Sequence, residues 1–328
     1  MLLSVLSVIA GLVLLVIGGE WLVKGAVRIA DRAGLSPLVV GLVVVGFGTS
    51  VPELATSVDA ALSGTPGIAW GNIVGSNIAN CLLVLGCAAL VYPIAINRQE
   101  MLRDPLIALA AALLLLGVGL SGFDKFITGA VFILLLCGYV WWCYWSERKT
   151  TSPEFHSGPH DRAAALEMTD SSLHGAANGY AKPVMITLAG LAVLVGGARL
   201  LVYGATAIAQ YAGLSETLIG LTVVAIGTSL PELVTSVVAA LRRQGAIAFG
   251  NVVGSSIYNI LAIGGATMLL APDSLPISIL AFDLPISTAI QALLVLAIFT
   301  MRSLNRVTGA VLLGGYIIYT SYLVISAF

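Results

Sequence analysis

Residues 34–86 begin with GLSPLVVGLVVVGFGTSVPELATSVDAAL and continue through GIAWGNIVGSNIANCLLVLG, and this stretch decides the fold because it occurs twice. Residues 213–265 begin with GLSETLIGLTVVAIGTSLPELVTSVVAAL and continue through AIAFGNVVGSSIYNILAIGG. The offset is 179 residues throughout, and the two segments are identical at 30 of 53 positions. Such self-similarity at a fixed offset indicates that one structural unit is present in two copies.

The composition around the two copies indicates a membrane protein. Of 328 residues, 59% are hydrophobic and only 9% are charged, and the mean hydropathy is +1.02. Soluble domains carry about 25% charged residues, so a soluble enzyme and a disordered protein are excluded. The formal net charge of −1 provides no basic field for phosphates, which excludes a nucleic-acid binder.

Apolar runs predict ten membrane spans, with one polar interruption at residues 147–181. The runs fall at about 2–20, 37–62, 68–91, 105–121, 124–145, 183–204, 215–240, 246–271, 276–300 and 307–327. The predicted fold class is therefore an all-α polytopic membrane protein with ten transmembrane helices. We divide it into a first five-helix repeat (1–146), a linker (147–181) and a second five-helix repeat (182–328).

The two copies are expected to cross the membrane in opposite directions, because an odd number of spans, five, separates them. Such an inverted-topology repeat is typical of secondary transporters, whose ion site lies at the midplane between the repeats. Lysine and arginine fix the orientation, since cytoplasmic loops carry the excess of both. Thirteen fall on the side of the linker and one, Lys125, on the other, while Arg199 lies inside a span. The linker is therefore predicted to be cytoplasmic and both termini external.

Each copy carries the motif G-T-S-x-P-E near the middle of a span. Its residues are Gly48, Thr49, Ser50, Pro52 and Glu53, and then Gly227, Thr228, Ser229, Pro231 and Glu232. Proline removes a backbone donor, so the helix should break and leave carbonyl oxygens without partners. A charged side chain at mid-bilayer costs at least about 2.5–3.5 kcal/mol. Because no basic residue stands at a matching central position, a cation or a proton is the expected counter-charge of the glutamates.

The span after each motif adds oxygen atoms at helical spacing. These are Asn72, Ser76 and Asn80 in the first copy and Asn251, Ser255 and Asn259 in the second. Carboxylate, hydroxyl, amide and carbonyl oxygens together suit a hard cation such as Ca²⁺. Zinc or copper would favour histidine or cysteine, and neither belongs to the motifs.

The paired segments GFGTSVPELATS with GNIVGSNIAN and AIGTSLPELVTS with GNVVGSSIYN resemble the two alpha repeats of the sodium/calcium exchanger family, in the calcium/cation antiporter superfamily, in its prokaryotic form. The resemblance implies an antiporter that exports Ca²⁺ while Na⁺ enters, with the first and sixth spans sliding as a gate. The ligands it implies are the carbonyls of Gly46 and Ala225 and the side chains of Thr49, Ser50, Glu53, Ser76, Asn80, Thr228, Ser229, Glu232, Ser255 and Asn259.

One position departs from the family pattern. An archaeal exchanger of the family has an aspartate where Asn259 stands, so one carboxylate is absent here. This leaves the number of sodium ions and the coupling ion open. The linker of about 35 residues is also too short for the calcium-sensing domains of animal exchangers.

The resulting functional prediction is a Ca²⁺/Na⁺ antiporter in a bacterial-type plasma membrane, working by alternating access. A Ca²⁺/H⁺ antiporter on the same fold and a cation channel are the alternatives. An enzyme is not expected, since no H-E-x-x-H metal motif is present. We expect no cofactor, with Ca²⁺ and Na⁺ as the transported ions. The lipid bilayer is the expected partner, without nucleic acid or an obligatory protein.

Overall fold

The computed structural model describes residues 2–33, 36–64, 66–121, 125–149, 180–211, 225–271 and 275–326. In these ranges, eight helices are long and apolar enough to cross a membrane, and one bent pair of helices makes a ninth candidate span. The expected span 215–240 is described only from Ala225 onward, because residues 212–224 lie outside the described ranges. The predicted count of ten is therefore not confirmed. Most of the predicted linker, residues 150–179, also lies outside the described residues.

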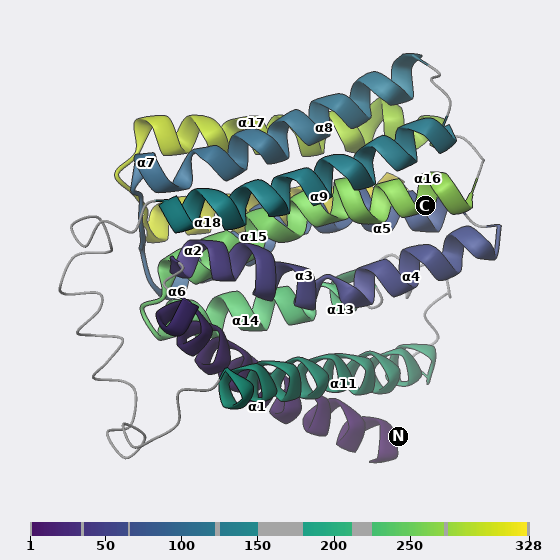
Figure 1. Cartoon of the computed structure of the whole chain (residues 1–328). Helices are drawn as coiled ribbons and strands as arrows, with labels where there is room; N and C mark the ends of the chain where they lie inside the picture. The colour runs from purple at the N-terminus through teal and green to yellow at the C-terminus, as the bar shows by residue number, and fades with distance from the viewer. Residues whose placement is uncertain are drawn as a thin grey trace.

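Two long helices, α1 (Leu2–Ala33) and α11 (Ala181–Tyr211), lie side by side at one edge of the molecule (Figure 1). Both extend beyond the predicted spans 2–20 and 183–204. Their contact is lined by glycines at seven-residue spacing, which match between the copies. They are Gly11, Gly18 and Gly25 in α1 and Gly190, Gly197 and Gly204 in α11. Small residues at an interface let two membrane helices approach until their backbones touch.

The first broken span bends as the proline predicts. It consists of α2 (Pro37–Val40), η1 (Gly41–Val45), α3 (Gly46–Thr49) and α4 (Val51–Leu62). The two halves meet at Ser50, which has φ −81° and ψ 3°, and the bend between them is 42°. Pro52 has no backbone N–H to donate to the Gly48 carbonyl, so the helix cannot continue unbroken here. The predicted break is confirmed.

The second copy repeats this break where it is described. There α13 (Ala225–Thr228) ends at Ser229, with φ −89° and ψ 5°, and α14 (Leu230–Leu241) begins. The motif serine therefore has similar backbone angles in both copies.

The spans that follow the breaks form the core of the bundle. They are α5 (Pro66–Ala79), η2 (Asn80–Val84) and α6 (Leu85–Val91) in one copy, and α15 (Gly245–Tyr258), η5 (Asn259–Gly264) and α16 (Gly265–Leu270) in the other. The most apolar windows of these spans are 78% and 89% buried. In both copies a π-helical segment begins at the matching asparagine, Asn80 or Asn259. Such π segments are frequent at functional sites, and the sequence analysis did not predict them.

The remaining elements surround this core (Figure 1). They are α7 (Arg98–Met101), α8 (Arg103–Ser121), α9 (Lys125–Lys149), η6 (Ile279–Asp283), α17 (Leu284–Thr300) and α18 (Arg306–Ser326). Helix α8 packs against α17, α9 against α16, and α18 against α6. The most apolar window of α18 is only 6% buried, so this helix presents its apolar surface outward, as a lipid-facing helix does.

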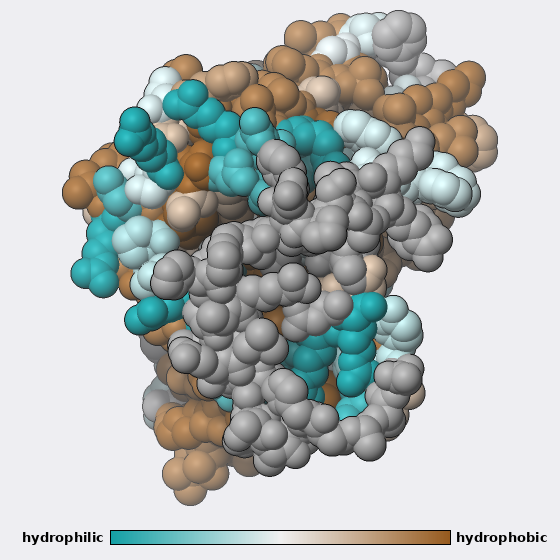
Figure 2. Space-filling model, turned by 60° about the vertical axis from the view of Figure 1, so that its left-hand side comes forward, coloured by the Kyte–Doolittle hydropathy of each residue, from teal (hydrophilic) through white to brown (hydrophobic). Residues whose placement is uncertain are grey.

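Two short strands, β1 (Ile94–Ala95) and β2 (Ser303–Leu304), pair antiparallel and join two loops that follow core and outer helices. These strands were not predicted from the sequence. Figure 2 shows hydrophilic residues gathered around this end of the molecule, whereas hydrophobic residues dominate its flanks. The segregation of polar and apolar surface agrees with a multi-pass membrane protein.

Candidate ion-binding site

The two motif glutamates are buried immediately after the helix breaks. Glu53 lies in the first turn of α4 and Glu232 in the first turn of α14, and each is 1% exposed. A negative charge near a helix N-terminus is stabilised by the helix dipole. The break therefore both places each carboxylate at mid-span and presents backbone dipoles that favour its charge.

Each break faces the glutamate of the other copy. The hydroxyl of Ser50 donates to Oε1 of Glu232 over 3.2 Å, and the hydroxyl of Ser229 donates to Oε1 of Glu53 over 3.3 Å. These reciprocal bonds bring both carboxylates to one place between the repeats. In each glutamate the second oxygen, Oε2, is buried and has no hydrogen-bond partner.

In each copy, one asparagine joins the broken helix to the span that follows it. Nδ2 of Asn72 donates to the Ser57 hydroxyl (2.9 Å) and to the Glu53 carbonyl (3.1 Å). In the second copy, Nδ2 of Asn251 donates to the Ser236 hydroxyl at 2.9 Å and to the backbone carbonyl of its own motif glutamate at 3.3 Å. In both copies, therefore, one asparagine Nδ2 donates to the same two kinds of acceptor, a serine hydroxyl and the backbone carbonyl of the motif glutamate.

The threonines of the motif complete this structural network across the copies. The hydroxyl of Thr49 donates to Oδ1 of Asn251 at 3.1 Å, and that of Thr228 donates to Oδ1 of Asn72 at 3.3 Å. The sequence analysis placed both asparagines in an oxygen stripe for a cation. In the structure their amides instead join helices, so they hold the frame of the site rather than offer it unpartnered oxygens.

The carbonyl of Gly46, which the resemblance implies as an ion ligand, is already hydrogen-bonded. It accepts from the Ser50 N–H (3.2 Å), the Thr49 hydroxyl (3.4 Å) and the Ser255 hydroxyl (3.2 Å). The physical reason is that proline removes the donor to Gly48, two residues later, while the turn at Gly46 still closes.

The matching turn of the second copy is built differently. The Ser229 N–H bonds to the carbonyl of Ile226 at 3.2 Å, so the turn is tighter by one residue. Ala225 begins α13, and its side chain lies outside the described part of the structure. In the first copy's next span, the hydroxyl of Ser76 accepts from Ser229 at 3.4 Å. Ser76 and Ser255 therefore both contact a broken helix of the opposite copy.

The last pair of predicted residues, Asn80 and Asn259, lies at the starts of the π-helical segments. Each is 1% exposed, and Oδ1 of each is buried without a hydrogen-bond partner. Nδ2 of Asn259 donates to Oδ1 of Asn77 at 3.1 Å. The sequence analysis did not single out Asn77, although position 77 is where the two copies exchange one polar residue for another.

Among the residues predicted to be ion ligands, four buried acceptor oxygens lack donors: Oε2 of Glu53, Oε2 of Glu232, Oδ1 of Asn80 and Oδ1 of Asn259. The two ion pairs between described side chains, Arg103 with Asp104 and Arg242 with Glu20, do not involve the motif glutamates. Buried carboxylates without a counter-charge are costly. Oxygens of these classes are the ligands that hard cations prefer. Among the described residues, no group of three or more His, Cys, Asp and Glu side chains is placed to hold a metal ion.

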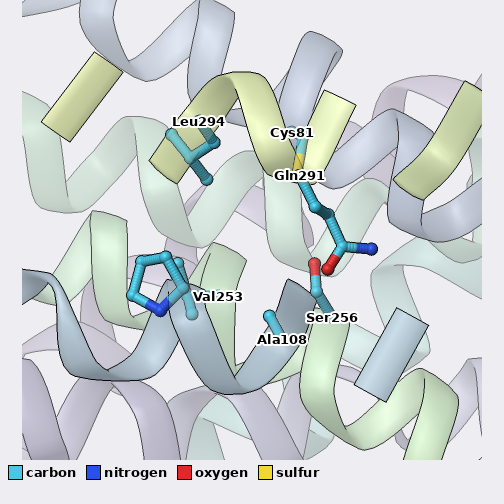
Figure 3. Close-up of a pocket in the computed structure, with 7 residues that line it drawn as sticks. Cys81, Ala108, Val253, Ser256, Gln291 and Leu294 are labelled. Atoms are coloured by element: carbon cyan, nitrogen blue, oxygen red, sulfur yellow. The ribbon is translucent and has the colours of Figure 1, made fainter. Parts of the chain in front are cut away.

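A small, mostly apolar cavity lies beside this oxygen set (Figure 3). Its lining residues are Cys81, Pro105, Ala108, Val253, Ser256, Gln291 and Leu294. Cys81 follows Asn80 in the chain. Gln291 is 2% exposed, and neither Oε1 nor Nε2 has a hydrogen-bond partner. Because the lining carries no carboxylate, the cavity is distinct from the cation site.

Comparison with known proteins gives a consistent result over nearly the whole chain. A family model described as "Sodium/calcium exchanger protein" matches residues 3–145 and 182–325. The putative antiporter CaxA of Alkalimonas amylolytica is 37% identical, covering 100% of both chains. The sodium/calcium exchanger MaX1 of Methanosarcina acetivorans is 34% identical, covering 96% of each. A solved structure of the sodium-calcium exchanger NCX_Mj is 31% identical, covers 98% of each chain and superposes with a TM-score of 0.80.

Proposed function

Because this chain belongs to the sodium/calcium exchanger family, we propose that it exchanges Ca²⁺ for Na⁺ across the membrane by alternating access. The coarser assignment, a multi-pass membrane antiporter for cations including Ca²⁺, follows from the family itself. The identity of the coupling ion, the ligands and the orientation are part of the proposal.

One observation carries the proposal: the four buried oxygens without donors, two of them from carboxylates of opposite repeats. Two glutamates neutralise one Ca²⁺, and Na⁺ ions compete for the same oxygens. A ligand can shift a two-state equilibrium only by binding the states differently. Exchange follows if the chain changes its facing state with the site filled by Ca²⁺ or by Na⁺.

The ligand set of the proposal extends from those four oxygens to the polar atoms around them. It comprises the side chains of Thr49, Ser50, Glu53, Ser76, Asn80, Thr228, Ser229, Glu232, Ser255 and Asn259, with the carbonyls of Gly46 and Ala225. The serines and threonines have hydroxyl lone pairs that remain available after each hydroxyl donates its proton. The Gly46 carbonyl is the weakest member, since three donors already surround it.

The proposed orientation places the linker in the cytoplasm and both termini outside, on the basis of the lysine and arginine distribution. In this orientation Arg242, which follows α14, lies at the cytoplasmic side, as do the strands β1 and β2.

The experiment is uptake of radioactive Ca²⁺ into liposomes that contain the purified protein and are loaded with Na⁺. Dilution into Na⁺-free buffer imposes the outward Na⁺ gradient, and a pH gradient is imposed separately. We expect uptake that requires the Na⁺ gradient and is absent from liposomes carrying Glu53→Gln. Uptake driven only by the pH gradient would overturn Na⁺ coupling. Single-channel currents would overturn exchange altogether.

A further inference from the structure

The two copies differ beside the ion site at the residue three positions before each terminal asparagine. Asn77 precedes Asn80 in the first copy, and Ser256 precedes Asn259 in the second. Asn77 reaches across to the other copy, where its Oδ1 accepts from Nδ2 of Asn259 at 3.1 Å. Ser256 instead donates its hydroxyl to the carbonyl of Val252 on its own helix, at 2.9 Å. Of Asn77 and Ser256, only Asn77 forms a hydrogen bond with an asparagine of the site.

In this bond the Asn259 amide presents its N–H₂ end to Asn77. A carboxamide has an acceptor oxygen on one side of Cγ and an N–H₂ donor on the other. Oδ1 of Asn77 can accept only from the N–H₂ end, because two carbonyl oxygens would repel each other. With Nδ2 held in this way, Oδ1 of Asn259 points away from Asn77 and is buried without a partner. A half-turn of the amide would instead present N–H₂ to a cation.

We propose that Asn77 is a positioning residue for cation binding, which holds Asn259 with its amide oxygen toward the transported ion. The inference rests on the proposed function, because it takes Asn259 to be a ligand. The inference also explains why an asparagine at position 259 needs a residue that orients its side chain, whereas an aspartate does not. Both ends of a carboxylate are oxygens, so either end can face the cation, whereas an amide must be oriented. Asn77 is 2% exposed, so water does not compete for the bond.

The test is the affinity of the purified protein for Ca²⁺, measured by equilibrium binding of the radioactive ion. Removing one buried hydrogen bond in Asn77→Ala should weaken Ca²⁺ binding roughly fivefold. The matched control is Ser256→Ala, at the equivalent position of the second copy. Its affinity should not change, because the Ser256 hydroxyl donates to Val252 on its own helix and bonds no asparagine of the site. An Asn77→Ala protein that binds Ca²⁺ as the wild type does would overturn the inference.

A second background separates positioning from general support of the fold. In Asn259→Asp, both ends of the side chain are oxygens, so adding Asn77→Ala should cost much less affinity than it costs the wild type. Residues in direct contact show such non-additivity, and independent effects do not. An equal loss in both backgrounds would mean that Asn77 acts on packing alone and would overturn its positioning role.

Failure of this inference and failure of the proposed function give different results. If the wild type binds Ca²⁺ but takes none up under a Na⁺ gradient, the exchange mechanism is wrong, and the two binding comparisons still decide the role of Asn77. If uptake is coupled to Na⁺ and the two comparisons show no effect of Asn77, only the positioning role is wrong.

Discussion

The residues of the site fall into two groups. In one group the side-chain polar atoms all form hydrogen bonds that join helices, and in the other group one side-chain oxygen has no hydrogen-bond donor. Asn72 and Asn251 donate and accept within the frame. Glu53 and Glu232 each use one carboxylate oxygen in a serine bond and leave the other without a donor. This division cannot be read from residue type, because asparagine occurs in both groups.

The glutamates are therefore the first residues to test. Glu53→Gln and Glu232→Gln preserve size but remove one negative charge and turn one oxygen into a donor. We expect each variant to lose Ca²⁺ uptake in liposomes while eluting as a monodisperse protein in detergent. The parallel variants Ser57→Ala and Ser236→Ala remove frame hydroxyls on the same helix faces and should retain uptake. Uptake by both glutamine variants would refute the site.

Gln291 should be replaceable with a gain in stability. A buried amide without partners costs about 1–3 kcal/mol, and methionine has a similar volume and no such requirement. Gln291→Met should therefore raise the midpoint of thermal unfolding in detergent and leave Ca²⁺ uptake unchanged. A lower midpoint would show that the Gln291 amide has a stabilising partner in the folded protein.

Among the helices, the contact of α1 with α11 depends on backbone approach. A Cβ atom at Gly18 would lie 2.5 Å from the Leu194 nitrogen, and one at Gly197 would lie 2.9 Å from the Leu15 nitrogen. The glycines recur every seven residues, which keeps one face of each helix turned to the other. The interface therefore has no room for even a methyl group at these positions.

Adjacent glycines of α11 provide a matched test of this contact. A Cβ at Gly196 meets nothing within 4 Å, in contrast to Gly197. Gly197→Ala should lower the unfolding midpoint and slow transport, because the added methyl group would force α1 and α11 apart. Gly196→Ala should be neutral or stabilising, since alanine favours a helix over glycine by about 1 kcal/mol. Equal effects of the two substitutions would show that α1 and α11 can move apart to accept the methyl group without losing stability.

Over the whole molecule, the two copies differ in one ion pair that joins the outer helices to the core. Nη2 of Arg242, after α14, lies 2.7 Å from Oε1 of Glu20 in α1. At the offset of 179 residues, Arg199 stands for Glu20 and Ser63 stands for Arg242. If the copies exchange conformations between facing states, the equivalent contact on the other side lacks this ion pair. The ion pair between Arg242 and Glu20 should then favour the conformation in which the site is closed on the side of the membrane where the pair lies.

Breaking the pair should favour opening on the side of the linker. Exposed ion pairs contribute about 0.2–1 kcal/mol, so Glu20→Gln should lower the KM for Ca²⁺ on that side by about 1.5- to 5-fold. Oriented membrane vesicles of both orientations provide the measurement. The charge-exchanged variant Glu20→Arg with Arg242→Glu should restore the wild-type KM. If Glu20→Gln leaves the KM on the linker side at the wild-type value, the ion pair does not have this role.

Features that are local or that repeat could be predicted from the amino-acid sequence alone. The offset of 179 residues predicted two equivalent units, proline at position 52 predicted a break in its helix, and burial of a carboxylate in an apolar run predicted a counter-charge. These predictions follow from chain geometry and solvation, which act over a few residues or over a span.

Which oxygens are left without donors depends on contacts between the two repeats. The bonds between Ser50 and Glu232 and between Asn77 and Asn259 each join residues 182 positions apart, and the Gly46 carbonyl gains a donor from Ser255, 209 positions away. No local pattern encodes such pairs, because they depend on how closely two helices from opposite repeats approach. The sequence identified the polar residues, and packing between the repeats determined which of them bond to other helices and which keep a buried oxygen without a donor.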